Sequence, residues 1–127
     1  MKRVLVCEDE DLIRKGICKI VEGVCRDVQV QECDNGLEGY KAIAMWNPHV
    51  VITDIRMPVM DGLEASRRIR ALEIGGRKRT PIIALSANAF EEDIRLAQEA
   101  GIDEYIVKPI DFRKVTAALS VCRSSAR

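Results

Sequence analysis

Short apolar runs alternate with longer amphipathic segments along the whole chain. The runs at residues 4–7, 50–52 and 82–85 are continuously apolar, as is typical of strands that are buried on both faces of a sheet. Residues 28–31 alternate apolar and polar side chains, and residues 105–107 form the last run. The pattern therefore predicts five strands, the second of which is more open on one side.

Each run is followed by a segment whose apolar residues recur at helical spacing. The predicted helices cover about residues 13–24, 37–46, 63–72, 91–100 and 111–122. The pair Asn47-Pro48 closes the second helix, and Gly101 is a favoured residue for ending the fourth. Asp111 is a good N-cap for the fifth helix.

Strands that alternate with helices predict a parallel sheet with helices on both faces, a three-layer α/β/α domain. The 127 residues suit one domain. A doubly wound open sheet fits this length better than a closed eight-stranded barrel. We expect the domain to span residues 1–122, with residues 123–127 as a flexible C-terminal tail.

The composition points away from a general nucleic-acid or membrane-surface binder. The chain has 20 Lys and Arg against 20 Asp and Glu, a formal net charge of zero. No apolar stretch approaches the roughly 18 residues of a membrane span, and acidic residues stand where a signal peptide would be apolar. The five cysteines are odd in number and form no C-x-x-C pair, which favours reduced thiols and a cytoplasmic location. They are Cys7, Cys18, Cys25, Cys33 and Cys122.

Polar side chains follow four of the predicted strands. These segments are Glu8-Asp9-Glu10-Asp11 after the first strand, Asp54 after the third, Ser86-Ala87-Asn88 after the fourth and Lys108-Pro109 after the fifth. Because ligands of such sheets bind beyond the carboxyl ends of the strands, we expect these groups to converge on one edge. Glu10 and Asp11 also suit a solvated helix start.

Carboxylates brought together in this way repel one another unless a cation neutralises them. Oxygen ligands that leave positions open for water and phosphate suit Mg²⁺. A carboxylate beside Mg²⁺, a lysine and a hydroxyl can act as the nucleophile of phosphoryl transfer. The set therefore indicates an aspartyl phosphate.

Four segments together give a specific resemblance that extends from about residue 2 to residue 119. They are VLVCEDED, VVITDIRMPVMDG, PIIALSANA and AGIDEYIVKPID. The chain resembles the response-regulator receiver domain of two-component signalling. This resemblance implies the flavodoxin-like fold, with five parallel strands in the order 2-1-3-4-5.

The resemblance also implies a role for each polar group. Asp54 matches the phosphoacceptor, and Glu8 and Asp9 match the acidic pair that binds Mg²⁺ together with Asp54 and the backbone carbonyl of Arg56. The groups that bind the phosphoryl oxygens are matched by Lys108, Ser86 and the backbone of Ala87. The switch residues are matched by Ser86 and Tyr105. The positions that tune the lifetime of the phosphoryl group are matched by Arg56 and Asn88. Glu8 stands where Asp is commoner in the family, which can change how the metal is held.

The implied function is a phosphorylation switch with slow autophosphatase activity, not a turnover enzyme. A histidine kinase or histidine phosphotransfer protein would donate the phosphoryl group to Asp54. Phosphorylation would then alter the surface of the fourth helix, fifth strand and fifth helix, which signals to a downstream partner or attached output domain. A homodimer is compatible with this function, and we expect no direct contact with nucleic acid or membrane.

Three alternatives stand beside this interpretation. A phosphatase of the haloacid dehalogenase type needs an aspartate two residues after the nucleophile, where this chain has Arg56. A phosphorylation-independent interaction module on the same fold predicts the loss of acidic or lysine residues that are present here. The chain also suits a receiver excised from a hybrid histidine kinase or from a longer transcriptional regulator, and the sequence leaves these sources open.

The remaining charged residues suggest no chemistry. The basic run in and after the third predicted helix is typical of a solvated face. It contains Arg67, Arg68, Arg70, Arg77, Lys78 and Arg79. His49, the single histidine, has no partner that the sequence identifies. Pro109 allows a cis peptide bond after Lys108.

Overall fold

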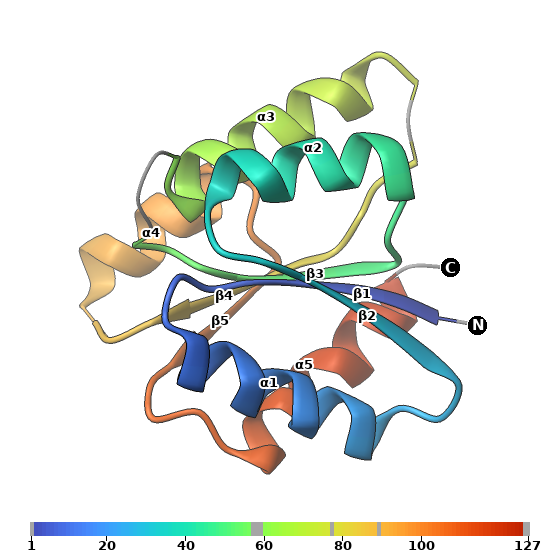
Figure 1. The fold of residues 1–127 in the computed structure, drawn as a ribbon. Helices are drawn as coiled ribbons and strands as arrows, with labels where there is room; N and C mark the ends of the chain where they lie inside the picture. The colour runs from blue at the N-terminus through green and yellow to red at the C-terminus, as the bar shows by residue number, and fades with distance from the viewer. Residues whose placement is uncertain (1, 57–59, 77, 89, 126–127) are drawn as a thin grey trace.

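A five-stranded parallel sheet forms the centre of the computed structural model, which describes residues 2–56, 60–76, 78–88 and 90–125 (Figure 1). The strands are β1 (Lys2–Cys7), β2 (Val28–Cys33), β3 (Val50–Asp54), β4 (Ile82–Ser86) and β5 (Glu104–Val107). Their order in the sheet is β2-β1-β3-β4-β5. The expected parallel sheet and its strand order are therefore confirmed.

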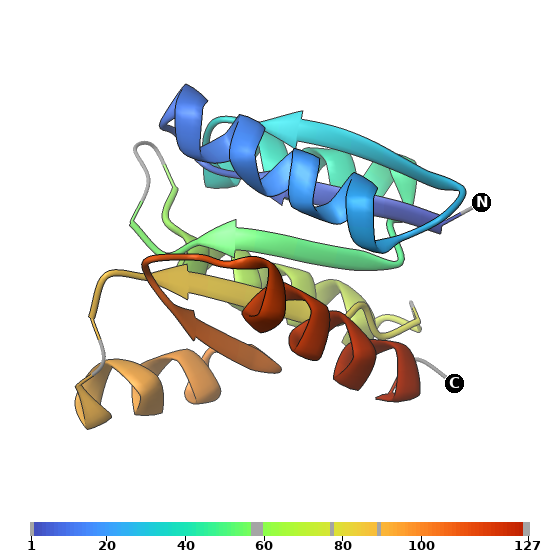
Figure 2. The same ribbon diagram turned by 90° about the horizontal axis from the view of Figure 1, so that it is seen from below.

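Five helices cover the two faces of this sheet. They are α1 (Asp11–Val24), α2 (Gly36–Trp46), α3 (Gly62–Ile74), α4 (Glu91–Glu99) and α5 (Phe112–Ser125). Figures 1 and 2 show α1 and α5 on one face and α2, α3 and α4 on the other. The three layers are those of the flavodoxin-like fold.

Alternation along β1 explains the two cores. Val4 and Val6 pack toward α1 and α5, in a cluster that includes Ile17. Leu5 and Cys7 point to the opposite face and join the cluster under α2, α3 and α4. Because successive side chains of a strand face opposite ways, a strand between two helical layers must be apolar throughout, as the run at residues 4–7 is.

The predicted helix ends agree with the backbone. Asn47 follows α2 in the left-handed region with φ 59°, and Gly101 follows α4 with φ 92°. The Asp111 side chain accepts a hydrogen bond from the Lys114 backbone N–H at 2.9 Å, as an N-cap does. The bond between Lys108 and Pro109 is cis.

The C-terminal helix continues to Ser125, and residues 126–127 lie outside the described part of the chain. The flexible tail at residues 123–127 therefore stays a prediction. Cys7, Cys18, Cys25 and Cys33 are free thiols. Within the described ranges, none of the helices has both the length and the apolar character needed to cross a membrane.

Two glycines let α2 and α3 begin against the loop that follows β3. A Cβ on Gly62 would lie 2.4 Å from the carbonyl oxygen of Asp54, and a Cβ on Gly36 would lie 2.0 Å from that of Met60. The backbone N–H of each glycine donates to this loop, Gly62 to Ile55 and Gly36 to Met60, both at 2.8 Å. Close backbone approach thus fixes the loop after Asp54.

Candidate functional site

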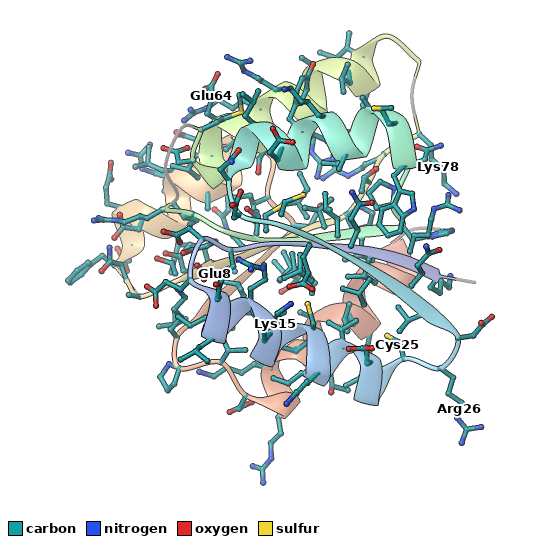
Figure 3. All side chains as sticks on the ribbon, in the orientation of Figure 1. Glu8, Lys15, Cys25, Arg26, Glu64 and Lys78 are labelled. Carbon is teal, nitrogen blue, oxygen red and sulfur yellow. The ribbon has the colours of Figure 1, made fainter. Side chains whose placement is uncertain are left out.

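Three carboxylates meet at the carboxyl edge of the sheet. Glu8 follows β1 directly, Asp9 is the next residue and Asp54 ends β3. One oxygen atom from each lies within 4.8 Å of the others. Figure 3 shows Glu8 at the end of the sheet opposite the N-terminus. The convergence expected for these three residues is therefore present in the structure.

Glu8 is held from both its backbone and its side chain. It is fully buried, with 0% exposure. Its backbone N–H donates to the Cys33 carbonyl at 2.9 Å, and its Oε2 accepts from the Glu10 backbone N–H at 3.1 Å. Arg14 of α1 donates from Nη1 to the Glu8 carbonyl at 2.8 Å. The sequence pattern does not reveal this contact of Arg14, because it depends on how α1 lies over the turn.

The electrostatic environment favours the neutral form of Glu8. Burial is the main cause that raises its pKa, to about 7, and the neighbouring Asp9 and Asp54 raise it further. The Glu10 backbone N–H and Lys108 act in the opposite direction but do not compensate. A carboxyl group in this position lacks enough positive charge around it to stay ionised as an ordinary glutamate does.

Lys108 lies between two of these carboxylates. Its Nζ is 3.3 Å from Glu8 Oε1 and 3.4 Å from Asp54 Oδ2. Burial lowers the pKa of this ammonium group, but the two carboxylates outweigh burial and the pKa is raised overall. The backbone N–H of Lys108 donates to the Ser86 carbonyl at 2.8 Å, which joins the ends of β4 and β5.

The turn after β4 connects the predicted switch residues. Ser86 is buried, and its Oγ accepts a hydrogen bond from the Asn88 backbone N–H at 3.1 Å. Tyr105 of β5 donates from its hydroxyl to the Asn88 carbonyl at 2.7 Å. Ala87, between Ser86 and Asn88, is exposed. Asn88 thus contacts both Ser86 and Tyr105 through its backbone.

Arg56 is exposed two residues beyond Asp54. The loop expected from Arg56 to Gly62 includes residues 57–59, which lie outside the described part of the chain. Its two described flanks meet, because Gly62 donates to Ile55. The metal-binding carbonyl and the lifetime role expected of Arg56 stay predictions.

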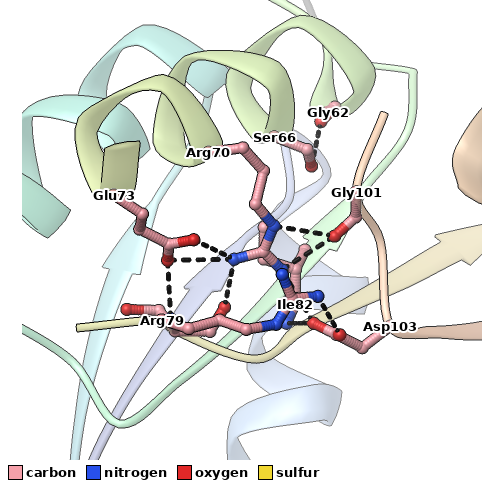
Figure 4. A network of polar contacts seen from close by, with 9 residues as sticks. Gly62, Ser66, Arg70, Glu73, Arg79, Ile82, Gly101 and Asp103 are labelled. Carbon is pink, nitrogen blue, oxygen red and sulfur yellow. Dashed lines mark hydrogen bonds and ion pairs between the residues drawn. The ribbon is translucent and has the colours of Figure 1, made fainter. Parts of the chain in front are cut away.

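Arg70 corrects the interpretation of the basic run as a solvated face. Its side chain is only 15% exposed. It donates to the Gly101 carbonyl, to both oxygens of Glu73 and to Asp103, at distances of 2.7 to 2.9 Å (Figure 4). The side chain therefore joins α3 to the loop before β5. Arg67 and Arg68 pair with Glu64 on the helix surface, and Arg77 lies outside the described residues.

The carboxylate cluster has the donor chemistry of a magnesium site. All of its ligand atoms are oxygens, which Mg²⁺ prefers. Among the described residues, Lys108 is the one ammonium group in contact with these carboxylates, and the pKa of Glu8 is raised mainly by burial and further by Asp9 and Asp54. A divalent cation would offset that charge, so the residues present fit the ion.

Comparison with known proteins identifies the family. The response regulator receiver domain family matches residues 4–120. The hybrid signal transduction histidine kinase G of Dictyostelium discoideum is 35% identical over 111 residues, which are 87% of this chain and 3% of that protein. The transcriptional regulatory protein PdtaR of Mycobacterium tuberculosis is 31% identical over 126 residues, 99% of this chain and 58% of that protein. The chain thus spans only part of these curated relatives.

Solved structures of receiver domains have the same fold as this chain. The receiver domain of a sensor histidine kinase from Pseudomonas aeruginosa, described with a magnesium ion coordinated in its active site cleft, superposes with a TM-score of 0.82 at 27% identity and covers 98% of this chain and 97% of that one. The receiver domain of the Francisella response regulator 1452 gives a TM-score of 0.87 at 24% identity, covers all of both chains and supports the fold alone. On its acidic site, its strand order and the family match over residues 4–120, the chain belongs to the response regulator receiver domains of two-component signalling.

Proposed function

We propose that the protein is a phosphoacceptor switch that takes a phosphoryl group onto Asp54 from the phosphohistidine of a histidine kinase or histidine phosphotransfer protein. The observation that carries the proposal is the contact of Lys108 with both Glu8 and Asp54 inside a group of three carboxylates. A structural ion pair would need one carboxylate. The excess acid is what a cation-dependent phosphorylation site requires.

In this proposal an oxygen of Asp54 attacks the phosphorus atom. The new oxygen–phosphorus bond forms as the phosphorus–nitrogen bond to the donor histidine breaks, and the histidine leaves with the electron pair. Lys108 already lies beside Asp54 Oδ2, where its ammonium group would stabilise charge on the phosphoryl oxygens. The backbone N–H of Ala87 and the hydroxyl of Ser86 would donate to the same oxygens.

Glu8 and Asp9, with Asp54 and the carbonyl of Arg56, would hold Mg²⁺. When bound, the ion supplies positive charge that offsets the phosphoryl oxygens and the clustered carboxylates. Glu8 is fully buried and anchored by Glu10 and Cys33, so its carboxylate is fixed in position before any ligand arrives. Because the Glu8 carboxylate is already in place, binding of the ion would need little rearrangement of the site.

Asn88 supports the proposed route from Asp54 to the surface of α4, β5 and α5. To donate to a phosphoryl oxygen, the Ser86 hydroxyl would move from its place beside the Asn88 N–H. The Asn88 carbonyl holds the Tyr105 hydroxyl, so the same movement would disturb Tyr105. Phosphorylation would bias two states of this surface, which a downstream partner, an output domain or a second copy reads.

Hydrolysis would reset the switch. Water attacks the phosphorus of phosphorylated Asp54 and releases inorganic phosphate, so the domain is a slow autophosphatase in this proposal. In this proposal the side chains of Arg56 and Asn88 would tune how long the phosphoryl group lasts. A receiver within a hybrid histidine kinase would use the same chemistry, and the Dictyostelium relative supports that context.

The test is the intact mass of the purified protein after incubation with acetyl phosphate and Mg²⁺. We expect wild type to gain one phosphoryl group that EDTA prevents and that disappears with time. Asp54→Asn should gain none. Asp34→Asn is the matched control, because Asp34 is an exposed aspartate at the same edge of the sheet, after β2 and outside the carboxylate cluster. Equal labelling of wild type and Asp54→Asn would contradict the proposal and favour a phosphorylation-independent interaction module.

A further inference from the structure

A cavity lies at the end of the sheet opposite the acidic cluster. It has a volume of about 820 Å³ and is formed by the beginnings of β1 and β3, the end of α1 and the loop before β4. This volume is in the range of small-molecule sites, which is roughly 300 to 1,000 Å³. Val50 lines the cavity and Asp54 belongs to the acidic cluster, so the two sites occupy opposite ends of β3.

The described residues that line this cavity include six with basic side chains and none with a carboxylate. The basic residues are Lys2, Arg3, Arg26, His49, Lys78 and Arg79, of which Arg79 is paired with Asp103 outside the cavity lining. Figure 3 shows Arg26 and Lys78 at the same end of the molecule, from opposite sides of the sheet. Because the net charge of the chain is zero, this concentration of positive charge is local.

The cavity also has apolar walls. Val4, Val24, Val50 and Leu119 contribute aliphatic surface beside the basic groups. A cavity that only bound small inorganic ions would not need this surface. An apolar wall next to several cations suits an organic anion, whose ring can lie on the wall while its charged groups meet the cations.

The surroundings of Arg3 and His49 indicate that the positive charge is incompletely offset. Arg3 donates to the Asn47 carbonyl from Nη2 and lies over the Trp46 ring, but its buried Nε has no hydrogen-bond partner among the described residues. Burial, followed by the charges of Arg3, Lys2 and Lys78, lowers the pKa of His49. The groups around His49 therefore oppose a further positive charge.

We propose that this basic cavity binds a phosphorylated organic anion of nucleotide size. The cations at the mouth would hold the phosphate groups, and the wall of Val24, Val50 and Leu119 would take the ring. The site is independent of the phosphorylation proposed for Asp54. It would give the domain a small-molecule input at the sheet end where phosphoryl transfer does not occur.

The test is a titration of the metal-free protein with ATP, in EDTA at low salt, in which NMR monitors binding. His49 and Trp46 are the only histidine and tryptophan of the chain, so their side-chain signals are unambiguous. We expect both signals to shift saturably with ATP, with a dissociation constant of about 1 mM or lower. Adenosine, which lacks the charge, should shift neither, and inorganic phosphate should bind at least about tenfold more weakly than ATP.

A pair of double variants locates the binding. Lys2→Gln with Lys78→Gln removes two exposed lysines of the cavity and should weaken ATP about tenfold. Lys19→Gln with Arg113→Gln removes two exposed cations elsewhere and should change the affinity by less than about twofold. No saturable shift, an equal loss in both double variants, or equal binding of ATP and inorganic phosphate would overturn the proposal.

Discussion

Two clusters of charged side chains join the strands and helices of this domain, and they balance their charges differently. Around Arg70, two arginines face two carboxylates, and backbone groups complete the network. In the acidic cluster there are three carboxylates, and among the described residues Lys108 is the one cation paired with them, through Glu8 and Asp54. Glu8, Asp54, Arg70 and Glu73 are shielded from water, whereas Asp9 and Arg79 are exposed, so water screens only part of each cluster.

The difference separates a structural network from a binding site. Each Arg70 contact has good hydrogen-bond geometry at 2.7 to 2.9 Å, whereas the Lys108 contacts are longer, at 3.3 and 3.4 Å. The Arg70 cluster needs no further ligand to balance its charges. The second has spare carboxylate oxygens and a glutamate that binds a proton near neutral pH, so a cation can lower its free energy.

The largest effect should come from removing the cation of each cluster. Arg70→Met leaves Glu73 and Asp103 without their main partner and should lower the free energy of unfolding by about 3 kcal/mol. Lys108→Met should cost no more than about 1 kcal/mol, because Glu8 can take up a proton instead. Urea unfolding in EDTA at pH 7 measures both. Equal losses would mean that the two clusters do not differ in the way proposed.

The same substitution should have opposite signs in the two clusters. Asp103→Asn weakens charge-assisted hydrogen bonds to Arg70 and to the Ile82 N–H, and should cost about 2 kcal/mol. Asp54→Asn removes one of three like charges and should stabilise the metal-free protein by about 1 kcal/mol. Thermal unfolding in EDTA gives both signs. A destabilised Asp54→Asn variant would show that repulsion in the acidic cluster is already relieved.

The sequence was sufficient to predict the fold and the meeting of Glu8, Asp9 and Asp54, for a physical reason. Parallel strands end at a common edge, so the residues that follow each apolar run must meet there. Glu8, Ser86 and Lys108 follow such runs directly and Asp54 follows one after Thr53, so the strands fix the positions of their backbones. Only the register of neighbouring strands was needed to bring them together, and buried apolar runs specify that register well.

The contacts of long side chains on helices could not be predicted in this way. Arg70 stands in a basic run and resembles its neighbours in sequence, yet its guanidinium contacts Gly101 and Asp103, 31 and 33 residues away. His49 likewise had no evident partner, and its Nδ1 accepts the Arg3 backbone N–H at 3.0 Å. Such contacts depend on which loops pack beside the residue. A pattern of local spacing does not contain that information.

Magnesium should stabilise the protein through the acidic cluster alone. At a free Mg²⁺ concentration ten times the dissociation constant, the expected gain is about 1.4 kcal/mol. Asp54→Asn should lose most of this gain, whereas Asp103→Asn should retain it despite its lower starting stability, since Asp103 is outside the carboxylate group. Thermal unfolding across a Mg²⁺ series, with EDTA as the zero point, provides the measurement. A similar gain in both variants would place the cation elsewhere.

The smallest expected effect is on the pKa of His49 in the basic cavity. This cavity has an excess of positive charge, whereas the acidic cluster has an excess of negative charge. Burial and the neighbouring cations lower the pKa of His49 below its usual 6.5, so a proton binds more weakly to the folded than to the unfolded chain. The stability that neutral His49 preserves is complete above pH 6.5 and is lost as the pH falls through the folded-state pKa.

An NMR titration of the single histidine should give a pKa below 6.5, and the double variant Lys2→Gln with Lys78→Gln should raise this pKa. His49→Gln should remove this part of the pH dependence of unfolding. An unshifted pKa would mean that solvent already neutralises the cavity, and the charge excess would then distinguish only the acidic cluster.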